Sequence, residues 1–280
     1  MQTSRAWTVA KTTLDRFRKA EGALLAASLS HFGTLAIIPF LMVGAGLMVS
    51  FGSDSATQLS ELGTTEAYES FARPVRAFLP FIEPQMAADV RSLVRENAWT
   101  GLAGYLALFV TASLFGWGLL RVHMRIFGAA KEARFLAERL RVSIFLLAAL
   151  VLAAVSSLVW HGLDLLAEGP LRDSVFSTIV LALGFLISLK WFGGKRIRVK
   201  PLLAGVVLFS VAWQVAMMGF AHYVESRGFY ATYGTLGGVA CVMAWLYYAS
   251  TVYLISSCLV ATLNEDGSAP GAESAVDANS

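Results

Sequence analysis

Four histidines are the side chains of this sequence best suited to acid–base or metal chemistry: His31, His123, His161 and His222. No two of them stand at the HxxxH or HExxH spacing that places ligands on one helix face, and no paired-carboxylate spacing accompanies them. His161 and His222 could meet at one membrane surface beside Asp164 and Glu225, as a metal or proton site or as ordinary interfacial hydrogen bonds. We predict no catalytic residue, no metal and no cofactor, and we do not expect an enzyme.

Polar residues inside long apolar stretches are a second kind of candidate, because a polar group in hydrocarbon faces a partner helix or a cavity. Pro39 has no N–H to donate to the Leu35 carbonyl, which predicts a kinked helix with one free carbonyl beside His31. The expected polar cavity is formed by Ser30, His31, Thr34, Pro39, Gln214, Tyr233 and Ser250. The alternative for each residue is a hydrogen bond or a packing contact between helices.

Six stretches without acidic or basic residues are the elements that would position these side chains. The chain is 56% hydrophobic and only 15% charged, whereas about 25% charged is usual for a soluble domain. A helix needs about 20 apolar residues to cross a bilayer. The pattern predicts an all-α integral membrane protein, a bundle of about six transmembrane helices. We expect the spans near residues 24–50, 99–121, 142–164, 174–192, 201–224 and 232–261.

Basic residues concentrate in alternate connections between these spans, which predicts that both termini are cytoplasmic. Most of them are expected to set the topology. Some also suit contact with anionic phospholipid, at about 1 kcal/mol per basic side chain near the surface. The candidate lipid contacts are Arg125, Lys195, Arg196 and Arg198. Nucleic-acid binding is not expected, because the sequence has no aromatic-interleaved basic domain outside the membrane.

The predicted organisation has three parts. Residues 1–23 form a cytoplasmic N-terminal segment, and residues 24–263 form the six-span transmembrane domain. An outer loop over 52–98 has the spacing of two amphipathic helices. Residues 264–280 are polar, acidic and small, which predicts a disordered cytoplasmic tail.

Several segments resemble the YihY/BrkB family of multi-pass inner-membrane proteins, formerly labelled the ribonuclease BN family. The similar segments are AASLSHFGTLAIIPFL (26–41), LRVHMRIFG (120–128), KRIRVKPLLAG (195–205), YATYGTLGGV (230–239) and WLYYASTVYL (245–254). They occur in the family's order and spacing. The matching positions include Arg125, Gly205, Trp213, Tyr233, Gly234 and Trp245.

The sequence also departs from the family pattern. The last helix of the family usually ends with Gly-Ala-Glu, and the matching positions here are Ser256, Ser257 and Cys258, so the acid is missing. Met124 replaces a common Asn, and His31 replaces a common Tyr. Roles of the family Glu and Asn therefore cannot be carried over.

The resemblance implies a bacterial inner-membrane protein linked with the cell envelope, and we expect a transporter-like role that handles a lipid or amphipathic solute. The alternatives are a non-transporting scaffold for envelope integrity and a membrane-bound hydrolase. The ribonuclease label finds little support, because the cytoplasmic connections supply only Glu132 and Glu138 as acids, with His123 at their edge. The expected partners are the lipid bilayer, anionic phospholipid and an unknown small-molecule or lipid substrate; homo-oligomerisation is left open.

Overall fold

The computed structural model describes residues 2–51, 100–128, 140–145, 170–193, 197–227 and 229–266, together with a few positions between 148 and 159. Within these residues the chain is helical. The long helices of this part of the chain are α1 (Gln2–Lys19), α2 (Gly22–Phe51), α6 (Thr100–Phe127), α8 (Pro170–Phe192), α9 (Val199–Arg227) and α10 (Phe229–Asp266). The all-α fold class is therefore confirmed.

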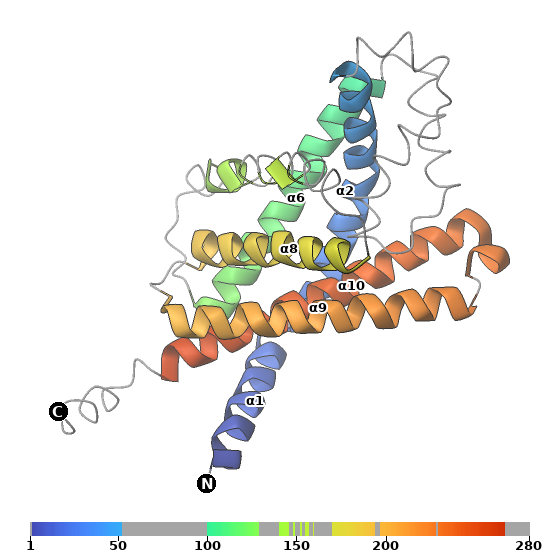
Figure 1. Cartoon of the computed structure of the whole chain (residues 1–280). Coiled ribbons are helices and arrows are strands. Elements are labelled where there is room, and N and C mark those ends of the chain that lie inside the picture. Colours follow the sequence, from blue (N-terminus) through green and yellow to red (C-terminus); the bar gives the residue numbers. More distant parts are fainter. Residues whose placement is uncertain are drawn as a thin grey trace.

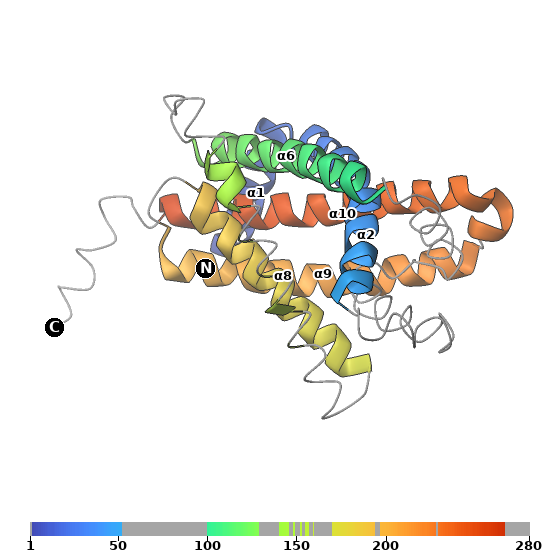
Figure 2. The ribbon, with the colours of Figure 1, turned by 90° about the horizontal axis from the view of Figure 1, so that it is seen from above.

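Helix α10 is the central element of the bundle, since it packs against α1, α2, α6 and α9. Helix α9 runs beside α10 along most of its length in both views, and α8 crosses α9 obliquely (Figures 1 and 2). Helices α2 and α6 form a second pair, and α2 crosses α10. Helix α1 leaves the bundle near the C-terminal end of α10 (Figure 1).

The outer surfaces of these helices are apolar. Along α9, exposed Leu203, Val207, Val211 and Val215 recur every four residues and form a stripe on one face. Three described stretches are long and apolar enough to cross a membrane: Ser174–Phe192, Val199–Tyr223 and Gly237–Asp266. Because water would not solvate such stripes, the surface fits a lipid environment.

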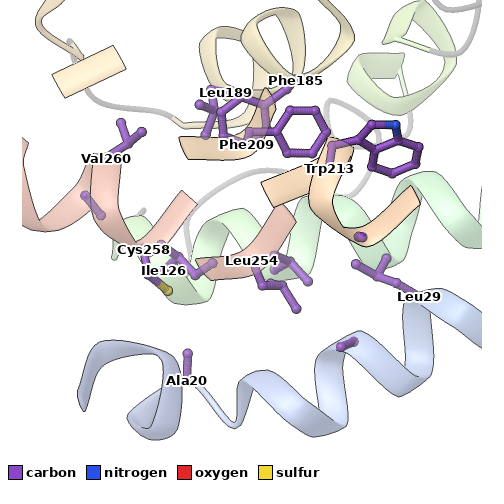
Figure 3. Close-up of a cluster of buried hydrophobic side chains, with 14 of the residues drawn as sticks. Ala20, Leu29, Ile126, Phe185, Leu189, Phe209, Trp213, Leu254, Cys258 and Val260 are labelled. Atoms are coloured by element: carbon purple, nitrogen blue, oxygen red, sulfur yellow. The ribbon is translucent and has the colours of Figure 1, made fainter. Parts of the chain in front are cut away.

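Aromatic and small residues form the core between α8, α9 and α10. The rings of Phe185 and Phe209 stack with their centroids 4.7 Å apart, and Trp213 meets Trp245 edge-on at 5.2 Å. Figure 3 shows Phe185, Phe209 and Trp213 near Leu254 in this core. These contacts fix the rotation of the three helices about their own axes, and so decide which polar side chains face inward.

Helices lie at five of the predicted span positions, those near 24–50, 99–121, 174–192, 201–224 and 232–261, and the last three contain the stretches long and apolar enough to cross a membrane. The third span, near 142–164, is described only in part, and its described positions are helical. The outer loop 52–98 and most of the tail after Asp266 lie outside the described residues, so their predicted structure is not tested. Sequence analysis missed α1, which makes a helix of most of the predicted N-terminal segment.

Candidate functional site: a buried polar junction

His123 lies on α6 and is fully buried. Its Nδ1 atom lies 2.8 Å from the Leu119 carbonyl oxygen, one turn earlier on the same helix. A carbonyl only accepts hydrogen bonds, so Nδ1 carries a hydrogen and donates it. In the neutral imidazole the other nitrogen, Nε2, is then an acceptor. It points at α10, where the Tyr253 hydroxyl lies 3.0 Å away.

Tyr253 joins α6 to α8 through its hydroxyl group. The same oxygen that faces His123 lies 2.7 Å from Oγ of Ser188 on α8. Ser188 is buried, and its Oγ also lies 2.7 Å from the Phe185 carbonyl oxygen of its own helix. His123, Tyr253 and Ser188 thus form one continuous polar chain across three helices, which we call the polar junction.

The polar junction has three hydrogen-bond arrangements, because its neutral groups hold three hydrogens for four contacts. In two of them Tyr253 donates to His123, while Ser188 donates either to Tyr253 or to the Phe185 carbonyl. In the third, Tyr253 donates to Ser188, and Ser188 donates to the Phe185 carbonyl. The single hydroxyl hydrogen of Tyr253 therefore points either toward α6 or toward α8, and each choice leaves one contact without a hydrogen.

Aromatic rings enclose the polar junction. The ring of Phe127 is stacked with His123 at 6.0 Å, and Phe192 is tilted against it at 5.5 Å. Phe185 meets Tyr253 edge-on at 5.2 Å. His123 and Ser188 are also buried, so a hydrogen bond lost from the junction is not readily replaced by one to water.

The predicted polar-cavity residues on α2 lie at different places. Ser30 is buried and donates to the Met243 carbonyl of α10 at 2.7 Å. Thr34 donates to the Ser30 carbonyl within its own helix at 2.8 Å. His31 is exposed and lies beside Phe32, with ring centroids 5.9 Å apart. Pro39 lies within α2, but its side chain is outside the described part of the structure.

The remaining cavity candidates lie on α9 and α10. Gln214 donates to the Ser174 carbonyl at 2.9 Å and also to the Thr178 hydroxyl, so it ties α9 to α8. Ser250 is half-buried on α10. Tyr233 lies in α10 with a side chain that is not described. Gln214 and Ser30 thus serve two different helix interfaces, and a shared cavity stays a prediction.

Two of the four predicted lipid contacts take part in contacts within the protein. Arg125 forms an ion pair of 2.9 Å with Glu21, in the turn between α1 and α2. The guanidinium of Arg198 donates to the Asn264 carbonyl at 2.9 Å, near the C-terminal end of α10, where a cation is favourable. Both arginines remain exposed, whereas Lys195 and Arg196 lie outside the described residues. Lipid contact stays a prediction for all four.

Sequence analysis missed Tyr253 and Ser188, and it placed His123 only at a membrane surface. Each of the three is a polar residue toward the same end of its helix. That signal could have grouped them, but it cannot say whether they face one another. Among the residues that the structure describes, no three His, Cys, Asp or Glu side chains are grouped as metal ligands would be.

Long apolar helices, lipid-compatible outer faces and a polar junction sealed inside the bundle define a polytopic α-helical membrane protein. The model of the virulence factor BrkB family matches residues 13–279, almost the whole chain. The chain belongs to this family, which confirms the resemblance drawn from the sequence.

Individual relatives are distant. The ribonuclease-like protein YfkH of Bacillus subtilis is 23% identical over 91% of this chain and 94% of its own length. A UPF0761 membrane protein of Rhodospirillum centenum is 24% identical over 92% of this chain and 57% of its own length. Another, from Aliivibrio salmonicida, is 22% identical over 86% of this chain and 78% of its own length. No solved structure matches the chain.

Proposed function

We propose that this protein is a transporter-like component of the bacterial inner membrane that moves or sequesters a lipid or amphipathic solute. The polar junction carries the proposal. An ionisable side chain enclosed between membrane helices is expensive to keep, and such residues commonly mark transport pathways or moving parts. Here the three members come from three different helices, so the hydrogen bonds of the junction depend on the relative positions of α6, α8 and α10.

The two orientations of the Tyr253 hydrogen give the proposed transporter a moving part. A Tyr253 hydrogen bond to His123 favours contact of α10 with α6, and a bond to Ser188 favours contact of α10 with α8. A substrate that prefers one helix arrangement would shift the balance by its difference in affinity for the two states. The junction is thus suited to coupling substrate binding to helix movement.

The apolar outer surface of the helices supports an amphipathic substrate. Bilayer lipid surrounds the exposed apolar stripes of the helices. An amphipathic molecule dissolved in the bilayer can therefore reach the protein without passing through water. We further propose an inner-membrane location with both termini cytoplasmic, which the positions of the basic residues favour. The same proposal treats the chain as a protein without catalytic activity; the ribonuclease-like name of YfkH is a property of that protein.

The test is reconstitution of the purified protein into liposomes loaded with fluorescently labelled phospholipid or amphipathic solutes. We expect protein-dependent flux of at least one probe, and we expect Tyr253→Phe to reduce that flux several-fold. Tyr248→Phe is the matched control, because Tyr248 lies on the same helix with a 58% exposed side chain. The control should keep wild-type flux.

Two results would contradict the proposal. No protein-dependent flux across a broad panel of probes would favour the scaffold, in which the helices anchor the protein to envelope partners. Equal flux from the wild type and Tyr253→Phe would remove the polar junction from the mechanism.

A further inference from the structure

An apolar groove opens between α1, α9 and α10, away from the polar junction. Its volume is about 680 Å³, within the usual range of ligand sites. Six residues of α1 form one wall, and one residue of α9 and two residues of α10 form the other. We call it the α1 groove, lined by Arg5, Ala6, Val9, Ala10, Thr13, Leu14, Leu208, Ile255 and Leu259.

The wall of the α1 groove is apolar with one charged exception. Thr13 is buried and donates its hydroxyl to the Val9 carbonyl at 2.8 Å, so its hydrogen is used within α1. The other uncharged lining residues are Ala, Val, Leu and Ile. Arg5 alone brings a charge to the groove. The lining suits a hydrocarbon chain that ends in an anionic group.

The position of the α1 groove along α10 fits a membrane lipid. Leu259 and Ile255 stand seven and eleven residues before Asp266 at the end of α10, which at 1.5 Å per residue is about 10 and 17 Å. That depth lies within the hydrocarbon of one leaflet when α10 ends at the bilayer surface. Leu208 is next to Val207 of the exposed α9 stripe, so the groove adjoins a surface that the bilayer covers.

Helix α1 has the composition of a helix that lies at a membrane surface. Trp7 is 73% exposed and Leu14 is 48% exposed, although both are apolar. The same helix carries the exposed cations Arg5, Lys11, Arg18 and Lys19. Exposed apolar and basic residues on one helix favour the interface of an anionic leaflet.

We infer that the α1 groove binds one anionic phospholipid, with an acyl chain along Val9, Leu208 and Ile255 and the headgroup phosphate at Arg5. The inference rests on the proposed function only in that it names a lipid as the class of ligand. It would make α1 part of the path by which lipid reaches the bundle. The alternative occupants, a zwitterionic lipid or a second copy of this chain, are outcomes of the test.

The experiment is native mass spectrometry of the full chain in detergent, titrated with phosphatidylglycerol or phosphatidylcholine of equal acyl length. We expect a phosphatidylglycerol adduct that forms at lower concentration than the phosphatidylcholine adduct. Arg5→Gln should weaken phosphatidylglycerol binding about fivefold, the equivalent of about 1 kcal/mol, and leave phosphatidylcholine unchanged. Lys11→Gln removes the same charge from α1 outside the groove lining and should bind as wild type.

A second variant tests the apolar part of the α1 groove. Ala10 lines the groove and is exposed, so Ala10→Phe fills the space without disturbing the core. It should weaken both lipids. Unchanged binding by this variant would overturn the site, and equal binding of both lipids by the wild type would overturn the preference for an anionic headgroup. A dimer that Ala10→Phe abolishes would assign the groove to a second copy instead. Flux without lipid binding in the groove would contradict this inference but not the proposed transport. Lipid binding in the groove without flux would contradict the proposed transport but not this inference.

Discussion

At the scale of single residues, the polar junction depends on a tyrosine that has two acceptors and one hydrogen. A phenylalanine in its place keeps the ring, and with it the edge contact with Phe185, but removes the only group that reaches both His123 and Ser188. The free energy at stake is modest, because hydrogen bonds between membrane helices average about 0.6 kcal/mol and reach about 1.7 kcal/mol.

We therefore expect Tyr253→Phe to lower the free energy of unfolding by about 1–2 kcal/mol, and Ser188→Ala to lower it by less. The double variant should lose less than the sum of the two, because both substitutions break the same contact. Thermal unfolding in detergent, followed by circular dichroism, measures all four proteins. Strict additivity would mean that Tyr253 and Ser188 do not form one network.

At the scale of elements, α9 and α10 approach closely because Gly205 has no side chain. A Cβ atom at this position would lie 2.1 Å from Cγ2 of Val260 and 3.4 Å from the Ser256 carbonyl oxygen. Val260 is fully buried and β-branched, so it has little freedom to move aside. Small residues at such crossings let membrane helices pack at short range.

Gly205→Ala should destabilise the protein by about 1–3 kcal/mol, the usual cost of overpacking. Gly219→Ala is the matched control on the same helix, since a Cβ there meets nothing within 4 Å. Alanine has the higher helix propensity, so the control should be neutral or slightly stabilising. Melting temperatures in one detergent compare the pair. A stable Gly205→Ala variant would show that α9 and α10 are not held by this contact.

The helices could be predicted from the sequence, because long stretches without charged residues indicate membrane-spanning helices whatever their packing. The polar junction did not, because it depends on helix rotation. Rotation is set by ring contacts such as Phe185 with Phe209 and Trp213 with Trp245, which join residues far apart in the chain. Helix α1 was not predicted for another reason: Ala6, Val9, Thr13 and Phe17 have helical spacing, but the many charges around them fit a basic cytoplasmic segment equally well.

At the scale of the whole molecule, the ends of three helices are held together by Arg16. Its guanidinium donates to the Ile126 carbonyl of α6 at 2.9 Å and pairs with Glu265 of α10. The turn after α1 adds the pair of Glu21 with Arg125. These contacts place the start of α2 and the ends of α6 and α10 on one side of the molecule. The proposed topology, with both termini in the cytoplasm, requires that arrangement.

The topology is tested by single cysteines in a chain whose native Cys241 and Cys258 are changed to Ser; both are buried. Lys11→Cys and Lys195→Cys should be labelled by a membrane-impermeant maleimide only after the inner membrane is opened. Ser60→Cys, in the predicted outer loop, should react in intact spheroplasts. Labelling of Lys195→Cys in intact spheroplasts would reverse the proposed orientation.

The stretch Gly237–Asp266 of helix α10 contains 30 residues, which at 1.5 Å per residue makes it about 45 Å long. A hydrocarbon layer is about 30 Å thick, and membrane helices tilt by at most about 40°. Even at that tilt this stretch spans about 34 Å along the membrane normal, so it must extend beyond the hydrocarbon on at least one side. The central helix of the bundle therefore reaches into the headgroup layer, and a movement of that end would also move the part of α10 that packs against α2 and α6.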